Sequence, residues 1–282
     1  MMSEASTDAP AVWAIGDVHG CCPSLEALLA RPEIAQDPGC RFWFVGDLVN
    51  RGSASAQTLR CVMDLGERAT VVLGNHDLRA LAIAAGCQRP GQGDTLDDLF
   101  RAPDAGMLLD WLRNRPLLHA EQGHVLVHAG VFPGWDLATA QALAREVEAL
   151  LRQDRWREHM RALCGRAPSA WDAALEGRRR LRFIVAALTR MKLCSRQGAM
   201  APGAKAAPGC WPRGTLPWFD LPGRMGATHT VVFGHWAALG LMVRKDAVCV
   251  DTGCVGGGAL TAYRLSDRKL LQVSREAAPL VR

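Results

Sequence analysis

The sequence of 282 residues contains no run of 18 or more apolar residues, so we expect no membrane-spanning helix. The first ten residues carry two acids and have neither a basic start nor an apolar core, which excludes a secretory signal peptide. We expect residues 1–10 to form a short disordered tail. With 49% hydrophobic and 22% charged residues, the composition also excludes a fibrous or largely disordered chain.

None of the ten cysteines belongs to a Cys-x-x-Cys pair, which disfavours a zinc site built on cysteine. A chain of this length buries about 75% of the surface that its unfolded state exposes, so it needs no disulfide framework for stability. We therefore expect free thiols and a cytoplasmic location.

Acidic residues are scarce in one part of the chain. Residues 152–196 contain 12 Lys and Arg but four Asp and Glu, so this segment carries a charge of +8 while the whole chain carries +5. A concentrated positive charge attracts a polyanion such as a nucleotide, a nucleic acid or a phosphopeptide. A solvated helical face would give the same pattern.

Short apolar runs alternate with helical patterns along the chain. The runs are rich in Val, Ile and aromatic residues, as buried strands are, while apolar residues at spacings of three and four predict helices between them. This alternation predicts an α/β fold, with residues 11–282 as a single domain. The first strands are expected at Val12–Ile15, Arg41–Val45, Ala69–Leu73, Val125–Val127, Thr230–Phe233 and Ala247–Val250.

Two stretches depart from this alternation. The arginine-rich residues 136–194 predict a helical basic subdomain inserted into the fold. Residues 195–217 are rich in Gly, Pro and Ala and have little periodicity, which predicts a flexible loop or lid.

Five of the predicted strands end at Asp, Asn or His beside Gly. Open α/β sheets bind ligands at the carboxyl ends of their strands, and Gly lets the backbone turn sharply there. These side chains suit Mn, Fe, Zn or Co, and there are enough for two ions about 3.5–4 Å apart that share a carboxylate. The motifs are Gly16-Asp17-Val18-His19-Gly20, Gly46-Asp47-Leu48-Val49-Asn50-Arg51-Gly52, Gly74-Asn75-His76-Asp77, His128-Ala129-Gly130 and Gly234-His235-Trp236.

This set of motifs resembles the calcineurin-like metallophosphoesterases, and later stretches resemble the symmetrical bis(5′-nucleosyl)-tetraphosphatases among them. The resemblance covers about residues 11–274. It implies a central β-sandwich flanked by helices, two divalent metal ions, and hydrolysis of diadenosine tetraphosphate to two ADP. The later stretches include Trp111-Leu112-Arg113, Leu188-Thr189-Arg190-Met191, Pro217-Trp218-Phe219 and Asp251-Thr252-Gly253-Cys254.

The resemblance also assigns roles to residues of this chain. Arg51 matches an arginine that grips a phosphoryl oxygen, His76 matches the catalytic histidine, and Asp77 closes the motif of that histidine. The implied metal ligands are Asp17 and His19 for the first ion, Asp47 as the bridge, and Asn75, His128 and His235 for the second.

These roles form a consistent chemistry. Two cations lower the pKa of a bridging water toward neutrality, and the resulting hydroxide attacks phosphorus in line. The metals and Arg51 stabilise the charge on the equatorial oxygens, and His76 donates a proton or a hydrogen bond to the departing oxygen. We expect Mn or Co as the ions, with Fe, Zn and Mg as alternatives.

One position departs from the Ser/Thr phosphatases of the family, whose motif has the sequence Gly-Asp-x-Val-Asp-Arg-Gly. The second Asp of that motif pairs with the catalytic histidine, and this chain has Asn50 instead. An amide orients an imidazole but does not stabilise its charged form as a carboxylate does. Since ADP is a better leaving group than a serine alkoxide, Asn50 favours a nucleotide substrate.

Three further residues are candidates for substrate contact. Arg190 lies in a stretch that matches the family and is expected to contact phosphate. Arg182 would span outer phosphates or lie on a solvated helix face, and Trp236 would stack on adenine or pack in the core.

Other substrates and functions remain open at this point. Nucleoside-tetraphosphate caps at RNA 5′ ends present a similar reacting group and form a second expected substrate. The alternatives are a protein Ser/Thr phosphatase and a non-catalytic nucleotide- or RNA-binding module. We expect no obligate protein partner and no membrane association.

Overall fold

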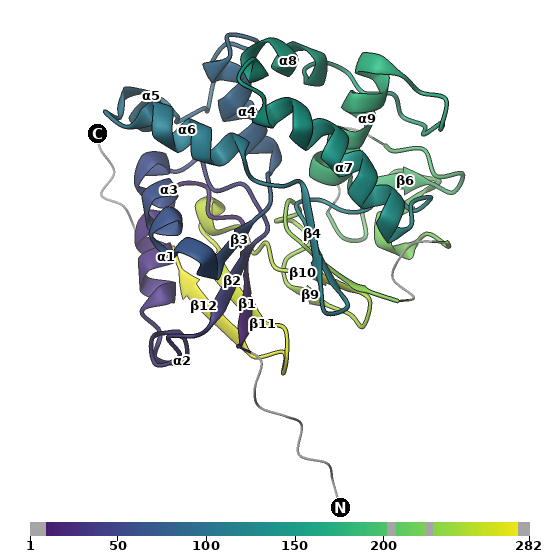
Figure 1. The fold of residues 1–282 in the computed structure, drawn as a ribbon. Helices are drawn as coiled ribbons and strands as arrows, with labels where there is room; N and C mark the ends of the chain where they lie inside the picture. The colour runs from purple at the N-terminus through teal and green to yellow at the C-terminus, as the bar shows by residue number, and fades with distance from the viewer. Residues whose placement is uncertain (1–9, 202–206, 224–227, 276–282) are drawn as a thin grey trace, which may run out of the picture.

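The computed structural model describes residues 10–201, 207–223 and 228–275 and has a mixed α/β architecture built on two five-stranded sheets (Figure 1). The first sheet has the order β12-β11-β1-β2-β3, in which β1, β2 and β3 are parallel. Its strands are β1 (Val12–Ile15), β2 (Arg41–Phe44), β3 (Ala69–Val71), β11 (Ala259–Arg264) and β12 (Leu270–Ser274).

The second sheet has the order β4-β5-β8-β10-β9, and its central strands β5, β8 and β10 are parallel. Apolar side chains of both sheets form one buried cluster, in which Ala14 and Trp43 of the first sheet meet Leu126 and Val232 of the second. The predicted central β-sandwich is thus confirmed. The strands of this sheet are β4 (Leu118–Glu121), β5 (His124–Val127), β8 (Thr230–Phe233), β9 (Met242–Val243) and β10 (Ala247–Cys249).

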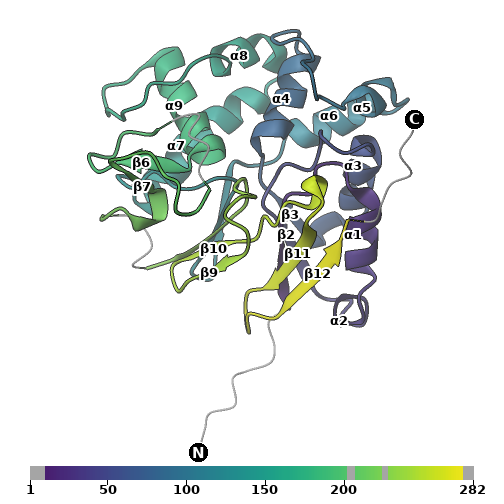
Figure 2. The same ribbon diagram turned by 180° about the vertical axis from the view of Figure 1, so that it is seen from behind.

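Helices flank the sandwich. Helix α1 packs against β11, β12 and α3 on the outer side of the first sheet, as Figure 2 shows from behind. These flanking helices bury apolar residues that recur at spacings of three and four, such as Leu25 and Leu28 in α1. The helices of this flank are α1 (Cys22–Leu29), α2 (Pro32–Ala35), α3 (Ser55–Asp64), α5 (Asp97–Arg101) and α6 (Ala105–Arg113), with a short turn η1 (Gly66–Arg68).

A second group of helices gathers at one end of the sandwich (Figure 1). It consists of α4 (Asn75–Ala84), α7 (Leu137–Arg152), α8 (Trp156–Leu163) and α9 (Gly177–Arg190). The last three pack on one another, and α8 also contacts α4. Helices α7, α8 and α9 lie within residues 136–194, where the sequence predicts a helical basic subdomain. Asp136 caps α7 by accepting a hydrogen bond from the Thr139 N–H at 2.7 Å.

Two features have bounds that the sequence prediction does not give. The segment predicted as a loop over 195–217 begins and ends in an antiparallel ribbon of β6 (Leu193–Ser195) and β7 (Thr215–Pro217), since short strands bounded by Gly and Pro give no periodic signal. Helix α8 lies inside the predicted helical subdomain, but the sequence gives it no bounds of its own, because just three of its residues, Trp156, Met160 and Leu163, are buried in an otherwise charged sequence. Two 3₁₀ turns, η2 (Trp218–Asp220) and η4 (Cys254–Gly256), complete the elements used below.

Some predictions concern residues that the structure does not describe. Residues 1–9 of the predicted tail and residues 202–206 of the predicted loop lie outside the described ranges. Within those ranges, no helix combines the length and apolarity needed to cross a bilayer.

Candidate dinuclear metal centre

The parallel strands bring the predicted metal ligands to one edge of the sandwich. Each ligand follows the carboxyl end of a strand, where the chain turns toward the helices. Asp17 and His19 follow β1, Asp47 follows β2, Asn75 follows β3 at the start of α4, His128 follows β5, and His235 follows β8.

Asp47 lies at the centre of this cluster and is 1% exposed. Its Oδ2 lies 3.5 Å from Nε2 of His19 and 3.4 Å from Nε2 of His128. Two groups of potential ligand atoms share Asp47, one with His19 and His76 and one with His128 and His235, and within each group the atoms lie within 4.8 Å of one another. A carboxylate shared by two groups is the arrangement that a dinuclear centre requires.

The imidazoles of His128 and His235 are oriented by backbone carbonyls. Nδ1 of His128 donates to the carbonyl oxygen of Val45 at 2.8 Å, which turns Nε2 toward Asp47 and Oδ1 of Asn75, the latter at 3.1 Å. Nε2 of His235 donates to the carbonyl oxygen of Arg190 at 3.2 Å, which leaves its Nδ1 lone pair available. Imidazoles whose other ring nitrogen donates to a carbonyl, and whose free ends converge on carboxylate and amide oxygens, fit a bound cation.

Asp17 shows that the cluster is short of positive charge. It is 4% exposed, and both of its carboxylate oxygens accept from the N–H of His235 at 3.2 Å. Burial, together with the charges of Asp251 and Asp47, raises the pKa of Asp17 well above its ordinary value. Several carboxylates buried side by side need cations, and the combination with imidazole and amide groups fits divalent transition metals.

The backbone of this region is held in an uncommon conformation. In the described ranges seven non-glycine residues have positive φ, and five of them are residues of the candidate centre and its motifs. Such conformations cost about 1–3 kcal/mol each and persist where the surroundings enforce them. The five residues are His19, Asp47, Asn50, Arg51 and His235.

Two glycines leave room for the carboxylates. A Cβ atom on Gly74 would lie 2.0 Å from Oδ1 of Asp47, and one on Gly234 would lie 2.0 Å from Oδ1 of Asp17. Both distances are impossible for real atoms, so the glycines of these motifs are required by the packing of the ligands.

Asn50 fixes the tautomer of His76. Its Oδ1 accepts from the N–H groups of Arg51 at 2.8 Å and Thr95 at 2.9 Å, which identifies the oxygen and leaves the amide nitrogen on the other side. That nitrogen donates to Oδ1 of Asp94 at 2.9 Å and to Nδ1 of His76 at 3.0 Å. Nδ1 of His76 is therefore an acceptor, and the proton of the neutral ring lies on Nε2.

The surroundings of His76 agree with a neutral imidazole. Burial, His19 and Arg51 outweigh the charge of Asp47 and lower the pKa of His76 to about 4. Arg79 forms an ion pair with Asp94, which holds the pKa of that carboxyl below its ordinary value. Asp94 therefore remains charged and keeps the amide of Asn50 in its orientation.

We expect Asn50→Asp to move the proton of His76 from Nε2 to Nδ1 or to place protons on both nitrogens, because a carboxylate accepts where the amide donated. Long-range ¹⁵N–¹H correlation spectra of the histidine rings check this. The matched control is Asn114→Asp, whose side chain donates instead to a carbonyl of its own helix. An unchanged His76 spectrum in Asn50→Asp would contradict the assigned tautomer.

Asp77 and Arg51 differ in their surroundings. Asp77 is fully buried, and its oxygens accept from backbone N–H groups of Asp47, Leu48 and Gly74 at 2.7 to 3.0 Å. Because backbone N–H groups occupy its oxygens, Asp77 holds the loops after β2 and β3 together, and its expected catalytic role stays a prediction. Arg51 is exposed, and its Nη1 donates to the carbonyl oxygen of Gly93 at 3.3 Å.

The predicted substrate-contact residues fall into two groups. Arg182 and Arg190 line a cavity between α8 and α9. Trp236 is 1% exposed and packs against Phe219, with 6.0 Å between ring centroids, so the structure presents no open face of this ring for stacking on a base. Core packing, the other expectation for Trp236, agrees with this burial.

Sequence reasoning missed three residues of the site. Arg79 follows the Gly74–Asp77 motif by two positions and Lys192 follows Arg190 by two, so nearness to recognised residues was the available signal. Burial lowers the pKa of Lys192, against the opposing charges of Asp251 and Asp17. Asp94 lies beyond a polar turn, and no spacing in the sequence relates it to Asn50.

Comparison with known proteins identifies relatives. The sequence model of the family described as calcineurin-like phosphoesterase matches residues 10–185. A protein of Bordetella pertussis named bis(5′-nucleosyl)-tetraphosphatase, symmetrical, is 55% identical over 262 residues, which cover 93% of this chain and 95% of that protein. A protein of the same name from Janthinobacterium sp. is 49% identical with the same coverage of each.

A solved structure gives the same fold. The crystal structure of a candidate diadenosine tetraphosphatase has a TM-score of 0.60 to this chain, with 23% sequence identity and 97% of both chains covered. At this identity the likeness shows a shared fold.

Proposed function

The chain belongs to the calcineurin-like phosphoesterase family, and on that basis we propose that it hydrolyses diadenosine tetraphosphate symmetrically to two ADP. The observation that carries the chemistry is the carboxylate of Asp47, shared by two groups of ligand atoms. The observation that carries the substrate is the 55% identity to a symmetrical tetraphosphatase over 93% of the chain.

Two divalent ions fit the residues present, and when bound they supply Lewis-acid stabilisation of charge on the phosphoryl group. We propose Mn or Co. In this proposal Arg51 binds a phosphoryl oxygen, and Nε2–H of His76 donates a hydrogen bond to the departing oxygen. The residues that would hold the ions are Asp17, His19, Asp47, Asn75, His128 and His235.

The tautomer of His76 supports a nucleotide substrate over a phosphoprotein. An imidazole that accepts a hydrogen bond at Nδ1 from Asn50 is neutral and a weak acid. It suffices for ADP, which leaves readily, but not for a serine alkoxide. The protein phosphatase is therefore not favoured, and the 55% identity to a named tetraphosphatase weighs against the non-catalytic binding module.

Two parts of the proposal, a second substrate and a location in the cell, are not stated by the names of the relatives. RNA 5′ ends with nucleoside-tetraphosphate caps present a similar reacting group, and a capped transcript left intact by active protein would overturn this extension. A cytoplasmic location is supported by ten free cysteines, none of them in a Cys-x-x-Cys pair, in a chain too long to need a disulfide framework.

Product analysis tests the proposed function. Protein stripped of metal and reloaded with Mn or Co should convert diadenosine tetraphosphate to ADP as the sole nucleotide product, separated by anion-exchange chromatography. A chelator should abolish the reaction, and added Mn or Co should restore it. ATP and AMP as products would overturn the symmetrical cleavage, and absence of any cleavage would overturn the proposed function.

A further inference from the structure

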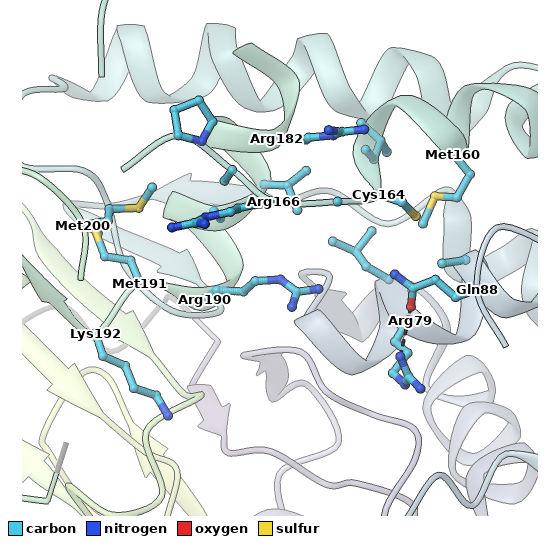
Figure 3. Close-up of a pocket in the computed structure, with 18 of the residues that line it drawn as sticks. Arg79, Gln88, Met160, Cys164, Arg166, Arg182, Arg190, Met191, Lys192 and Met200 are labelled. Carbon is cyan, nitrogen blue, oxygen red and sulfur yellow. Dashed lines mark hydrogen bonds between the residues drawn. The ribbon is translucent and has the colours of Figure 1, made fainter. Parts of the chain in front are cut away.

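A cavity of about 390 Å³ lies beside the candidate metal centre, between α4, α8 and α9 (Figure 3). Its volume falls in the range of about 300–1,000 Å³ that is typical of small-molecule sites. Much of its wall is apolar, and each of the three helices contributes. The apolar residues include Leu78, Ala82, Met160, Leu163, Val185 and Ala186.

The polar part of the wall is cationic. Five basic side chains line the cavity, and no carboxylate lines it in the described part of the chain. Arg79 is paired with Asp94, but the other four form no ion pair with a described carboxylate. Unpaired like charges around one cavity repel one another until an anion binds. These four are Arg166, Arg182, Arg190 and Lys192.

The cationic edge adjoins the metal centre. The carbonyl oxygen of Arg190 accepts from the imidazole of His235, so the cavity begins at the residue that orients a predicted metal ligand. The charge of Lys192 interacts with that of Asp17. Figure 3 shows Lys192 on the opposite side of the cavity from Met160, with Arg190 between them. An anion at this edge therefore has an apolar chamber beyond it.

Gln88 provides a directional group on the wall of that chamber. Its Oε1 accepts from Nη1 of Arg79 at 3.0 Å, which fixes the orientation of the amide. Its nitrogen then faces the cavity (Figure 3). Adenine presents ring-nitrogen acceptors that suit such a donor.

We propose that this cavity binds the nucleoside of one half of the substrate, with the phosphates along Arg190 and Lys192 and the base between Met160, Leu163 and the amide of Gln88. This inference rests on the proposed function. It explains why an apolar chamber and unpaired cations occur together, since a nucleotide is the ligand class that requires both.

Thiol protection tests the occupant without altering the protein. Cys164 lines the cavity, whereas Cys210 is exposed outside it. ADP at about ten times its Kd should slow alkylation of Cys164 about tenfold, as mass action requires, and leave Cys210 unaffected. Unprotected Cys164 would overturn the proposal. Equal protection by pyrophosphate would also overturn it, because the cavity would then bind phosphate without the nucleoside.

A filled cavity gives a second test. Ala186→Trp adds a ring to the wall, and the ratio of kcat/KM for diadenosine tetraphosphate to kcat/KM for bis(p-nitrophenyl) phosphate should fall about tenfold or more. The matched control is Ala138→Trp, on an exposed position of α7, which should leave the ratio unchanged. An unchanged ratio in folded Ala186→Trp would overturn the proposal. If the unaltered protein cleaved bis(p-nitrophenyl) phosphate but not diadenosine tetraphosphate, the proposed function itself would be overturned.

Discussion

Asp47→Asn should reduce kcat/KM for diadenosine tetraphosphate by about 10³-fold or more, since a metal site contributes several kcal/mol of charge stabilisation and about 4 kcal/mol corresponds to 10³ in rate. The substitution keeps the shape of the side chain and removes its charge. Burial would raise the pKa of Asp47, but His128 and His19 hold it below its ordinary value, so the carboxylate is charged. The amide that replaces it cannot serve two cations.

Metal content measured by mass spectrometry separates this explanation from a folding defect. Asp47→Asn should lose bound metal while its circular dichroism spectrum stays that of the unaltered protein. The matched control is Asp97→Asn, whose side chain is 85% exposed on α5, and it should retain both metal and activity. Full activity in Asp47→Asn would contradict the central role of this carboxylate.

Local sequence patterns predicted most of the sandwich. The predicted bounds of β1 and β8 agree with the structure, because each is a short run of Val, Ile or aromatic residues that ends at Gly. Helices α6 and α7 have apolar residues that repeat at helical spacing, which is the pattern that predicts helices between the strands. The ribbon of β6 and β7 depends on pairing across 20 residues, which no local pattern reports.

In the candidate site, too, some features could be predicted from local sequence and others could not. Its predicted ligands lie in short motifs at strand ends, so the fold alone brings them together. The partner of His76 could not be predicted, because the amide of Asn50 is oriented by Asp94 and Thr95, which lie 44 and 45 positions away. The cavity also depends on how α8 and α9 pack, which the helical prediction over 136–194 does not report.

Asp77→Ala should lower the free energy of unfolding by about 4 kcal/mol, because it leaves several buried N–H groups without an acceptor at about 1–3 kcal/mol each. These groups belong to Asp47, Leu48 and Gly74, so one carboxylate joins the loop after β2 to the loop after β3. Burial and the charge of Asp47 raise the pKa of Asp77 to about 6, and the hydrogen bonds from the N–H groups of Gly74 and Asp47 offset part of that cost of burial.

The loss should extend to catalysis even where the variant remains folded. The N–H of Asp47 donates to Asp77, which positions Asp47, and the N–H of His76 donates to Oδ1 of Asp47 at 2.7 Å. Urea denaturation of metal-free protein measures the stability, and Asp97→Ala on the exposed face of α5 should change it by less than about 0.5 kcal/mol. Asp77→Asn keeps one acceptor oxygen and should fall between the two. A stability equal to that of Asp97→Ala would mean that water replaces the carboxylate at these N–H groups, and the two loops would then be held together by the metal centre itself.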